Sequence, residues 1–136
     1  MAGSRRGTPK VKRFNPTSAH PVRALQAWQV LIACAFNRQT VTYGDLAKLM
    51  YGKKAAGVLA QVLGHVAFFC QEHRLPALTA IVVGHKRGTP GHSIPLNAQQ
   101  LDSEREAVYA FGGQWFDVVP PTPDEFSAAY ANSKGS

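Results

Sequence analysis

The sequence contains few cysteines, few acidic residues and no long hydrophobic run. Its two cysteines, Cys34 and Cys70, both fall in apolar segments with helical spacing. This placement argues against a disulfide framework, so we expect a cytoplasmic protein. No run approaches the roughly 20 apolar residues that cross a bilayer. The N-terminal stretch lacks the apolar core of a secretory signal, and we expect no membrane partner.

Residue types that catalyse reactions are also poorly placed. Cys34 lies in an apolar helical run that disfavours its thiolate, and neither cysteine opens a helix, where a thiolate would be stabilised. Asp45 is expected to cap a helix, and three other acids are expected on an exposed helix, namely Asp102, Glu104 and Glu106. The histidines and cysteines show none of the spacings typical of zinc sites. We therefore expect no enzyme activity, no catalytic residue, no metal and no cofactor.

The charge balance favours a polyanionic partner. Fifteen lysines and arginines stand against eight acids, which leaves a net charge of +7 and an isoelectric point near 9.8. A basic domain of this size commonly binds nucleic acid or an anionic membrane surface. Because no strongly amphipathic basic helix is present, nucleic acid is favoured. We expect double-stranded DNA as the partner and a nucleoid-associated location.

The length of 136 residues indicates one folded domain, since a second core would leave too little chain for either. We place a disordered basic arm over residues 1–20, the domain over 21–131 and a tail over 132–136. The arm is too polar to bury apolar area, but it can lie along phosphates or act as a solubilising tail. Its five cations come without an acid and are Arg5, Arg6, Lys10, Lys12 and Arg13.

Three helices are predicted in the first half of the domain. Pro21 can open the first, because its fixed φ suits the first helical turn, and apolar residues keep helical spacing over 22–36. Thr42-Tyr-Gly-Asp45 nearly forms a capping box, which predicts a second helix that ends near 51–52. The third helix is expected over 53–72.

A β-hairpin is expected after the third helix. Residues 78–83 are β-branched and apolar and predict a strand, and residues 84–88 form a turn with a basic tip. Residues 89–95 return as the other arm, which is an edge strand at best because Pro90 and Pro95 cannot sit inside a sheet.

Two further helices are predicted near the C-terminus. Asn97 can cap one over 98–111, which Gly112-Gly113 ends. Residues 115–119 are expected as a short strand or extended segment, and 123–131 as a final small helix. The predicted fold class is α+β, mostly α. It is a winged helix, with a helix-turn-helix unit, a β-hairpin wing and an appended C-terminal helix.

Residues around the helix-turn-helix unit and the wing can contact DNA together. Lys53 and Lys54 stand where phosphates pass the start of a recognition helix, and Gln61 and His65 are four apart on its polar face. Gly57, on the same face, suggests close approach of a nucleic-acid backbone or another helix. The cations at the wing tip can reach a flanking phosphate and are Lys86 and Arg87. A solvated face of a basic protein is the alternative interpretation. Because no arginine or asparagine stands on the recognition face, we expect weak or shape-based specificity.

The segment Val41-Thr-Tyr-Gly-Asp-Leu-Ala-Lys-Leu49 resembles the corresponding segment of the O6-alkylguanine DNA alkyltransferases and of their non-catalytic relatives, the alkyltransferase-like proteins. The similarity covers about residues 20–120 and extends to Lys54-Ala-Ala and the ending Gly112-Gly-Gln-Trp-Phe116. The resemblance implies a winged helix that binds duplex DNA. It assigns Tyr43 to the tyrosine that presses on the backbone of a flipped nucleotide.

The chain departs from that family at its reactive residues. Gly57 stands where the resemblance implies an arginine finger, and Thr79 stands where it implies the nucleophilic cysteine. Without a thiolate and its histidine there is no covalent alkyl transfer. Without the arginine, base flipping loses the group that fills the gap. The resemblance therefore supports a non-catalytic, duplex-binding protein.

Two alternatives remain open at this stage. The first is a protein-protein interaction module, in which an exposed apolar patch would be formed by Phe68, Phe69, Trp115 and Phe116. The second is a modified-base sensor that flips nucleotides without alkyl transfer, which would depend on Tyr43.

Overall fold

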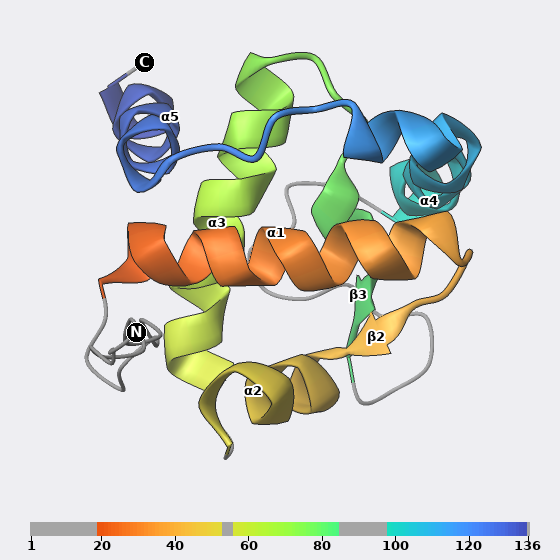
Figure 1. The fold of residues 1–136 in the computed structure, drawn as a ribbon, viewed down its shortest axis with the longest axis horizontal. Helices are drawn as coiled ribbons and strands as arrows, with labels where there is room; N and C mark the ends of the chain where they lie inside the picture. Colours follow the sequence, from red (N-terminus) through yellow and green to blue (C-terminus); the bar gives the residue numbers. More distant parts are fainter. Residues whose placement is uncertain (1–18, 53–55, 85–97, 136) are drawn as a thin grey trace, which may run out of the picture.

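Helix α1 (His20–Phe36) runs across the middle of the structure (Figure 1). Helix α3 (Ala56–Glu72) crosses α1, and helix α5 (Pro123–Gly135) packs against both. The structure is a computed structural model that describes residues 19–52, 56–84 and 98–135.

The other elements lie on two sides of α1. Helix α2 (Tyr43–Tyr51) lies below α1 in Figure 1, and helix α4 (Ala98–Phe111) lies at the upper right. Two 3-10 helices, η1 (Leu78–Ile81) and η2 (Gly112–Phe116), pack against α4. Within the described part of the chain, no helix is both long and apolar enough to cross a membrane.

A short parallel strand pair connects two distant parts of the chain. Strand β2 (Val41–Thr42) pairs with strand β3 (Val82–Val83), with Val41 opposite Val82. The pair joins the segment that enters α2 to the segment that leaves η1. It was not predicted, because the local pattern around residue 41 carries no information about a partner 41 residues further along the chain.

The core is centred on the fully buried ring of Trp28, in α1. Its centroid lies 5.7 Å from that of Phe69 in α3, 5.8 Å from that of Trp115 in η2 and 6.2 Å from that of Phe126 in α5. All three contacts are edge-to-face, the arrangement that brings the positive ring edge to the negative ring face. One side chain therefore joins four elements.

Helix α2 begins and ends where its sequence predicts. The Thr42 hydroxyl accepts a hydrogen bond from the Asp45 backbone N–H at 3.0 Å, which satisfies one donor of the first turn. At the other end, Gly52 adopts a left-handed conformation (φ +75°), and its N–H donates to the Lys48 carbonyl at 2.8 Å. Both caps are local, which is why the sequence alone predicted them.

The coarse fold class, α+β and mostly α, is confirmed. Helix α4 has the predicted bounds, 98–111, and α1 starts one residue before the predicted Pro21. Helix α5 continues to Gly135, so residues 132–135 are helical and not a tail. Part of the reason is a contact with α3, in which the Asn132 side-chain amide donates to the Glu72 carboxylate at 3.2 Å.

The predicted strand over 78–83 is mostly wrong. Residues 78–81 form the 3-10 helix η1, and only 82–83 form a strand. All six side chains are buried, and the Ala80 N–H donates to the Ala77 carbonyl at 2.8 Å. A short, continuous apolar run is compatible with either a buried strand or a buried helical turn, and here packing against α4 and α1 decided for the turn.

The extended segment expected over 115–119 is also wrong in its first part. Trp115 and Phe116 belong to η2, which continues the chain after α4. Gly112 takes a positive φ of 54° as α4 ends, in agreement with its predicted role. The Trp115 indole N–H donates to the Val108 carbonyl at 2.9 Å, so the turn is closed by a buried side chain.

The predicted wing lies largely beyond the described part of the chain. Its tip and returning arm, residues 85–95, are outside the described residues. The partner of β3 among the described residues is β2, in a parallel pair.

The two buried tryptophans provide a test of this core. Trp115 donates its indole N–H to Val108, whereas the indole N–H of Trp28 has no hydrogen-bond partner among the described residues. Replacement of either by phenylalanine removes the same volume, but only Trp115→Phe removes a buried hydrogen bond seen in the structure. We expect Trp115→Phe to lower the free energy of unfolding by about 1–2 kcal/mol more than Trp28→Phe. Urea unfolding followed by far-UV circular dichroism measures the difference, and a larger loss for Trp28→Phe would contradict the hydrogen-bond assignment.

Candidate nucleic-acid interface

The residues predicted to contact DNA fall into two groups, those that the structure describes and those that lie outside the described residues. Gly57 lies in α3, and three of the others have described side chains, namely Tyr43, Gln61 and His65. Nine lie outside the described residues: Arg5, Arg6, Lys10, Lys12, Arg13, Lys53, Lys54, Lys86 and Arg87.

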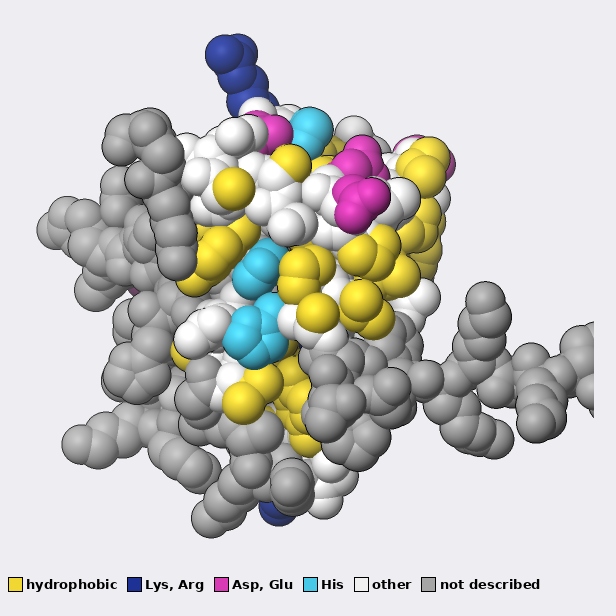
Figure 2. Space-filling model, turned by 90° about the vertical axis from the view of Figure 1, so that its left-hand side faces the viewer, with side chains coloured by type: hydrophobic (Ala, Val, Ile, Leu, Met, Phe, Trp, Pro, Cys, Tyr) yellow, Lys and Arg dark blue, Asp and Glu magenta, His cyan; other side chains and the backbone are white. Residues whose placement is uncertain are grey.

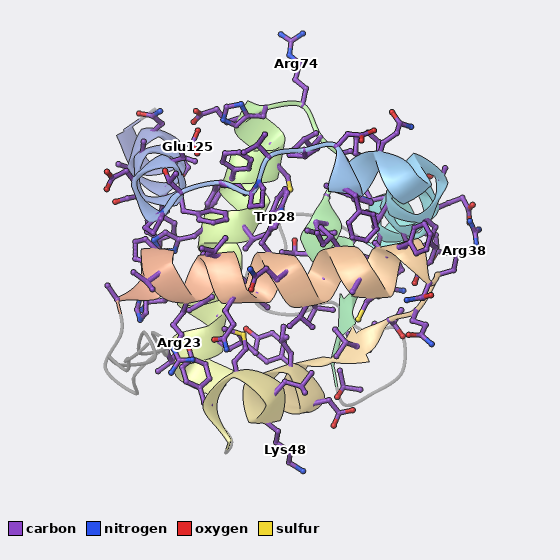
Figure 3. The ribbon with its side chains drawn as sticks, viewed as in Figure 1. Arg23, Trp28, Arg38, Lys48, Arg74 and Glu125 are labelled. Atoms are coloured by element: carbon purple, nitrogen blue, oxygen red, sulfur yellow. The ribbon has the colours of Figure 1, made fainter. Side chains whose placement is uncertain are left out.

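The outer faces of α2 and α3 carry two polar side chains that are available to a partner. Gln61 of α3 is exposed, as predicted. Lys48 of α2 is also exposed and points away from the body at the lower edge of Figure 3. Sequence reasoning missed Lys48, although its helical spacing places it opposite the buried stripe formed by Leu46, Ala47 and Met50.

His65 is buried, which corrects the prediction that it faces DNA beside Gln61. It is 6% exposed, and its ring stacks on that of Tyr130 in α5, with centroids 4.2 Å apart and planes within 5°. Its Nδ1 lies 2.7 Å from the Gln61 carbonyl, to which it donates. Helix α5 covers this face of α3 at His65, whereas Gln61, one turn earlier, stays exposed. Histidine side chains lie among hydrophobic ones on this side of the molecule (Figure 2).

Tyr43 is also buried, which corrects its predicted contact with a nucleotide backbone. Its side chain, 9% exposed, belongs to the same core cluster as Leu46 and Met50 on the inward face of α2. The hydroxyl has no hydrogen-bond partner within the described ranges, and burial raises the pKa of Tyr43 to about 12. The alternative of a modified-base sensor depends on Tyr43, and this side chain lies in the core.

Charge is segregated along the chain. Thirteen of the fifteen lysines and arginines lie in residues 1–87, where only two acids occur. Residues 88–136 contain six acids and two cations. Helices α4 and α5, which carry most of these acids, lie above α1 in Figure 1, whereas α2 lies below it. Figure 2 shows the acidic side chains gathered toward the upper part of the face in view. Most of the acids of residues 88–136 therefore lie on one side of α1, while nine of the thirteen cations of residues 1–87 lie outside the described residues.

On the acidic side, charged groups make contacts that hold the fold together. Glu106 pairs with Arg38 at 2.9 Å, and the Glu104 carboxylate accepts from the Ala77 N–H at 3.1 Å. The Arg105 side chain donates through Nε to the Ala80 carbonyl at 2.7 Å. These contacts tie α4 to η1 and to the end of α1. Cations are also present on this side: besides Arg38 and Arg105, Arg74 is exposed and points away from the body at the top of Figure 3.

The two cysteines and Thr79, which the sequence raised as nucleophile positions, are buried or partly buried. Burial raises the pKa of the fully buried Cys70 thiol to about 12 and raises that of the half-buried Cys34 as well. Thr79, at the position that the resemblance assigns to a nucleophilic cysteine, is fully buried, and its hydroxyl has no hydrogen-bond partner in the part of the chain that the structure describes. No group of three or more histidine, cysteine or acidic side chains within 19–52, 56–84 and 98–135 is placed to hold a metal ion.

The aromatic side chains that are exposed in the structure differ from the apolar patch that the sequence predicted for a protein-binding module. Phe69 and Trp115 are buried in the core, and Phe68 is half-buried beside a shallow depression between α3 and α5. Phe116 is 56% exposed, and its ring meets that of Phe36 edge-to-face, with centroids 5.4 Å apart. The exposed aromatic pair is therefore Phe36 and Phe116.

The burial of Tyr43 predicts a stability change at high pH. An unfolded tyrosine ionises near pH 10, and the folded side chain ionises near pH 12. Between these values the unfolded state loses the proton first, so the free energy of unfolding falls as pH rises. We expect Tyr43→Phe to show a shallower fall between pH 10 and 12, and no loss of stability below pH 10 because its hydroxyl is unpartnered among the described residues. Urea unfolding at pH 9 to 12 measures this, and parallel curves for both proteins would contradict it.

No protein-family model matches the chain, and no curated protein or solved structure matches it either. The distribution of charge along the sequence and the exposed side chains of Lys48 on α2 and Gln61 on α3 therefore support the proposed function.

Proposed function

We propose that this chain is a non-catalytic protein that binds double-stranded DNA through the side of the molecule that carries α2 and the start of α3. The observation that carries the proposal is the segregation of charge, with thirteen cations and two acids in residues 1–87. DNA presents a dense row of phosphates, which attracts the cation-rich part of the chain and repels the acidic side chains of α4 and α5.

The arrangement of α2 and α3 supports a winged-helix mode of binding. Helix α2 is capped by Thr42 and ends at the left-handed Gly52, after which the chain leads into α3. In a helix-turn-helix unit the first helix crosses the DNA backbone while the second enters the groove. Lys48 on the outer side of α2 and Gln61 on α3 are the described side chains available to these two roles. Lys53 and Lys54 lie between these two helices in the sequence.

The proposed binding is weak in sequence preference and strong in salt dependence. Gln61 is an exposed side chain that can read a base edge, whereas His65 and Tyr43 are buried and cannot. Few described side chains are therefore available for sequence recognition. Most of the affinity then comes from lysine and arginine contacts to phosphates, which release counterions. Such a protein suits an architectural or nucleoid-associated role. The non-catalytic part of the proposal is supported by the raised pKa values of both cysteines, which disfavour thiolates.

A second candidate function is favoured by one observation. Phe36 and Phe116 contact each other, yet each is more than half exposed. Aromatic side chains of this kind serve as anchors in protein interfaces. In this alternative the chain docks a protein through that pair, and binding resists salt because it depends on apolar burial.

Binding to duplex DNA can be measured by fluorescence anisotropy. We expect affinity for a random duplex of about 10–20 base pairs to fall steeply between about 50 and 200 mM salt. Lys48→Gln should lower the slope of log Kd against log salt by about one, and the Lys53→Ala, Lys54→Ala double variant by about two, because each phosphate that is no longer neutralised removes about 0.9 from it. Arg74→Gln is the matched control, since it removes one exposed cation from the opposite end of the molecule.

Two outcomes would contradict the proposal. Absence of binding at low salt would exclude DNA as the partner. Equal slopes for Lys48→Gln and Arg74→Gln would show that net charge alone drives binding and that no particular face is used. The Phe36→Ser, Phe116→Ser double variant separates the second candidate, because it should leave DNA binding unchanged and abolish a salt-resistant protein contact.

A further inference from the structure

Two exposed side chains lie one turn apart near the start of α3. This part of the helix is on the same side of α1 as α2, whereas the later part is covered by α5 through contacts such as that of Phe69 with Phe126 (Figure 1). Val58 and Gln61 are both exposed. Because they are three residues apart, they lie on one face of the helix, with Cβ atoms roughly 5–6 Å from each other.

Neither side chain contributes much to the fold. Val58 is 44% exposed, and a β-branched side chain at such a position adds little core packing and is a weaker helix former than a straight-chain residue. The Gln61 backbone carbonyl accepts from His65, but its side-chain amide has no hydrogen-bond partner within the described ranges. Both side chains are therefore available to a partner.

The chemistry of this pair is complementary to an A·T base pair. The primary amide of Gln61 presents a donor and an acceptor side by side, which match N7 and the N6 amino group of adenine in the major groove. The thymine of the same pair presents its C5-methyl group there, and an apolar side chain such as that of Val58 packs against it. A G·C pair has no methyl group in the groove and no adjacent acceptor and donor on its purine.

The length of helix that can be read is about one turn. One turn rises about 5.4 Å, whereas successive base pairs of DNA are about 3.4 Å apart, so the pair spans one or two adjacent base pairs. The next turn is not available on this face, because His65 is 6% exposed and stacks on Tyr130 of α5. A preference set by these two side chains is therefore local and modest.

We propose that Val58 and Gln61 are specificity-determining residues, which give the DNA-binding face a preference for A·T pairs read from the major groove. This inference rests on the proposed function. Contacts to phosphates supply most of the affinity, and these two side chains decide where along a duplex the affinity is greatest.

The test measures binding of the full chain to three duplexes of about 20 base pairs, built only of A·T, only of G·C or only of inosine·cytosine pairs. Each is closed by a hairpin loop so that it stays paired. An inosine·cytosine pair presents the edge of a G·C pair in the major groove and that of an A·T pair in the minor groove, so it identifies the groove that is read. Two modified A·T duplexes carry 7-deazaadenine, which lacks N7, or uracil, which lacks the methyl group.

We expect the unmodified chain to bind the A·T duplex about fivefold or more tightly than both the G·C and the inosine·cytosine duplexes. Uracil should weaken binding by up to about fourfold, which is the effect of one buried methyl group, and Val58→Ser should remove this sensitivity. Gln61→Ala should remove the sensitivity to 7-deazaadenine. The matched controls are Gln71→Ala, at the other end of α3, and Leu49→Ser, on α2, which replace exposed side chains of the same kinds and should retain both sensitivities.

The failures of the two proposals are distinguishable. If no duplex is bound in a salt-dependent way, the proposed function is wrong and this inference falls with it. If all three duplexes are bound equally, or the inosine·cytosine duplex is bound as tightly as the A·T duplex, only the major-groove readout is overturned. Retention of the A·T preference in a Val58→Ser, Gln61→Ala double variant that circular dichroism shows to be folded would overturn the assignment to these residues.

Discussion

The edge-to-face packing of Phe69, Trp115 and Phe126 around the Trp28 ring is the contact on which the rest of the structure depends. These four residues come from α1, α3, η2 and α5, so the core closes only when η2 and α5, near the C-terminus, pack onto α1 and α3. Helix α5 is therefore an integral part of the domain and not an appendage. Its Phe126 is fully buried, and removal of the helix would expose the central ring to water.

This closure decides which surfaces remain for a partner. Helix α5 covers one face of α3, which places His65 against Tyr130 and removes it from any groove. The first turn of α2 lies against the core, which buries Tyr43. What remains on this side is the outer face of α2 with Lys48, and the exposed Gln61 of α3. The acids gather on α4 and α5, on the other side of α1, where several of them bond to the backbone or to Arg38.

Predictions based on local signals were accurate. The Thr42 cap, the ends of α2 and α4, and the left-handed glycines at 52 and 112 follow from interactions within a few residues of each other. Predictions that depended on a choice between buried conformations failed. The apolar run at 78–83 and the aromatic pair at 115–116 suit a strand or a helical turn equally well, and tertiary packing placed most of the first and all of the second in 3-10 helices.

The sequence by itself determined the helical content, the helix caps and the excess of positive charge before residue 88, because propensity, capping and net charge are properties of neighbouring residues or of plain composition. Only the tertiary structure decided the parallel pairing of Val41 with Val82, the burial of His65 and Tyr43, and the contact of Arg23 with the end of α2. Each of these depends on which segments meet across the core. A residue's exposure is set by its distant neighbours, and the polarity of a single helix face does not specify them.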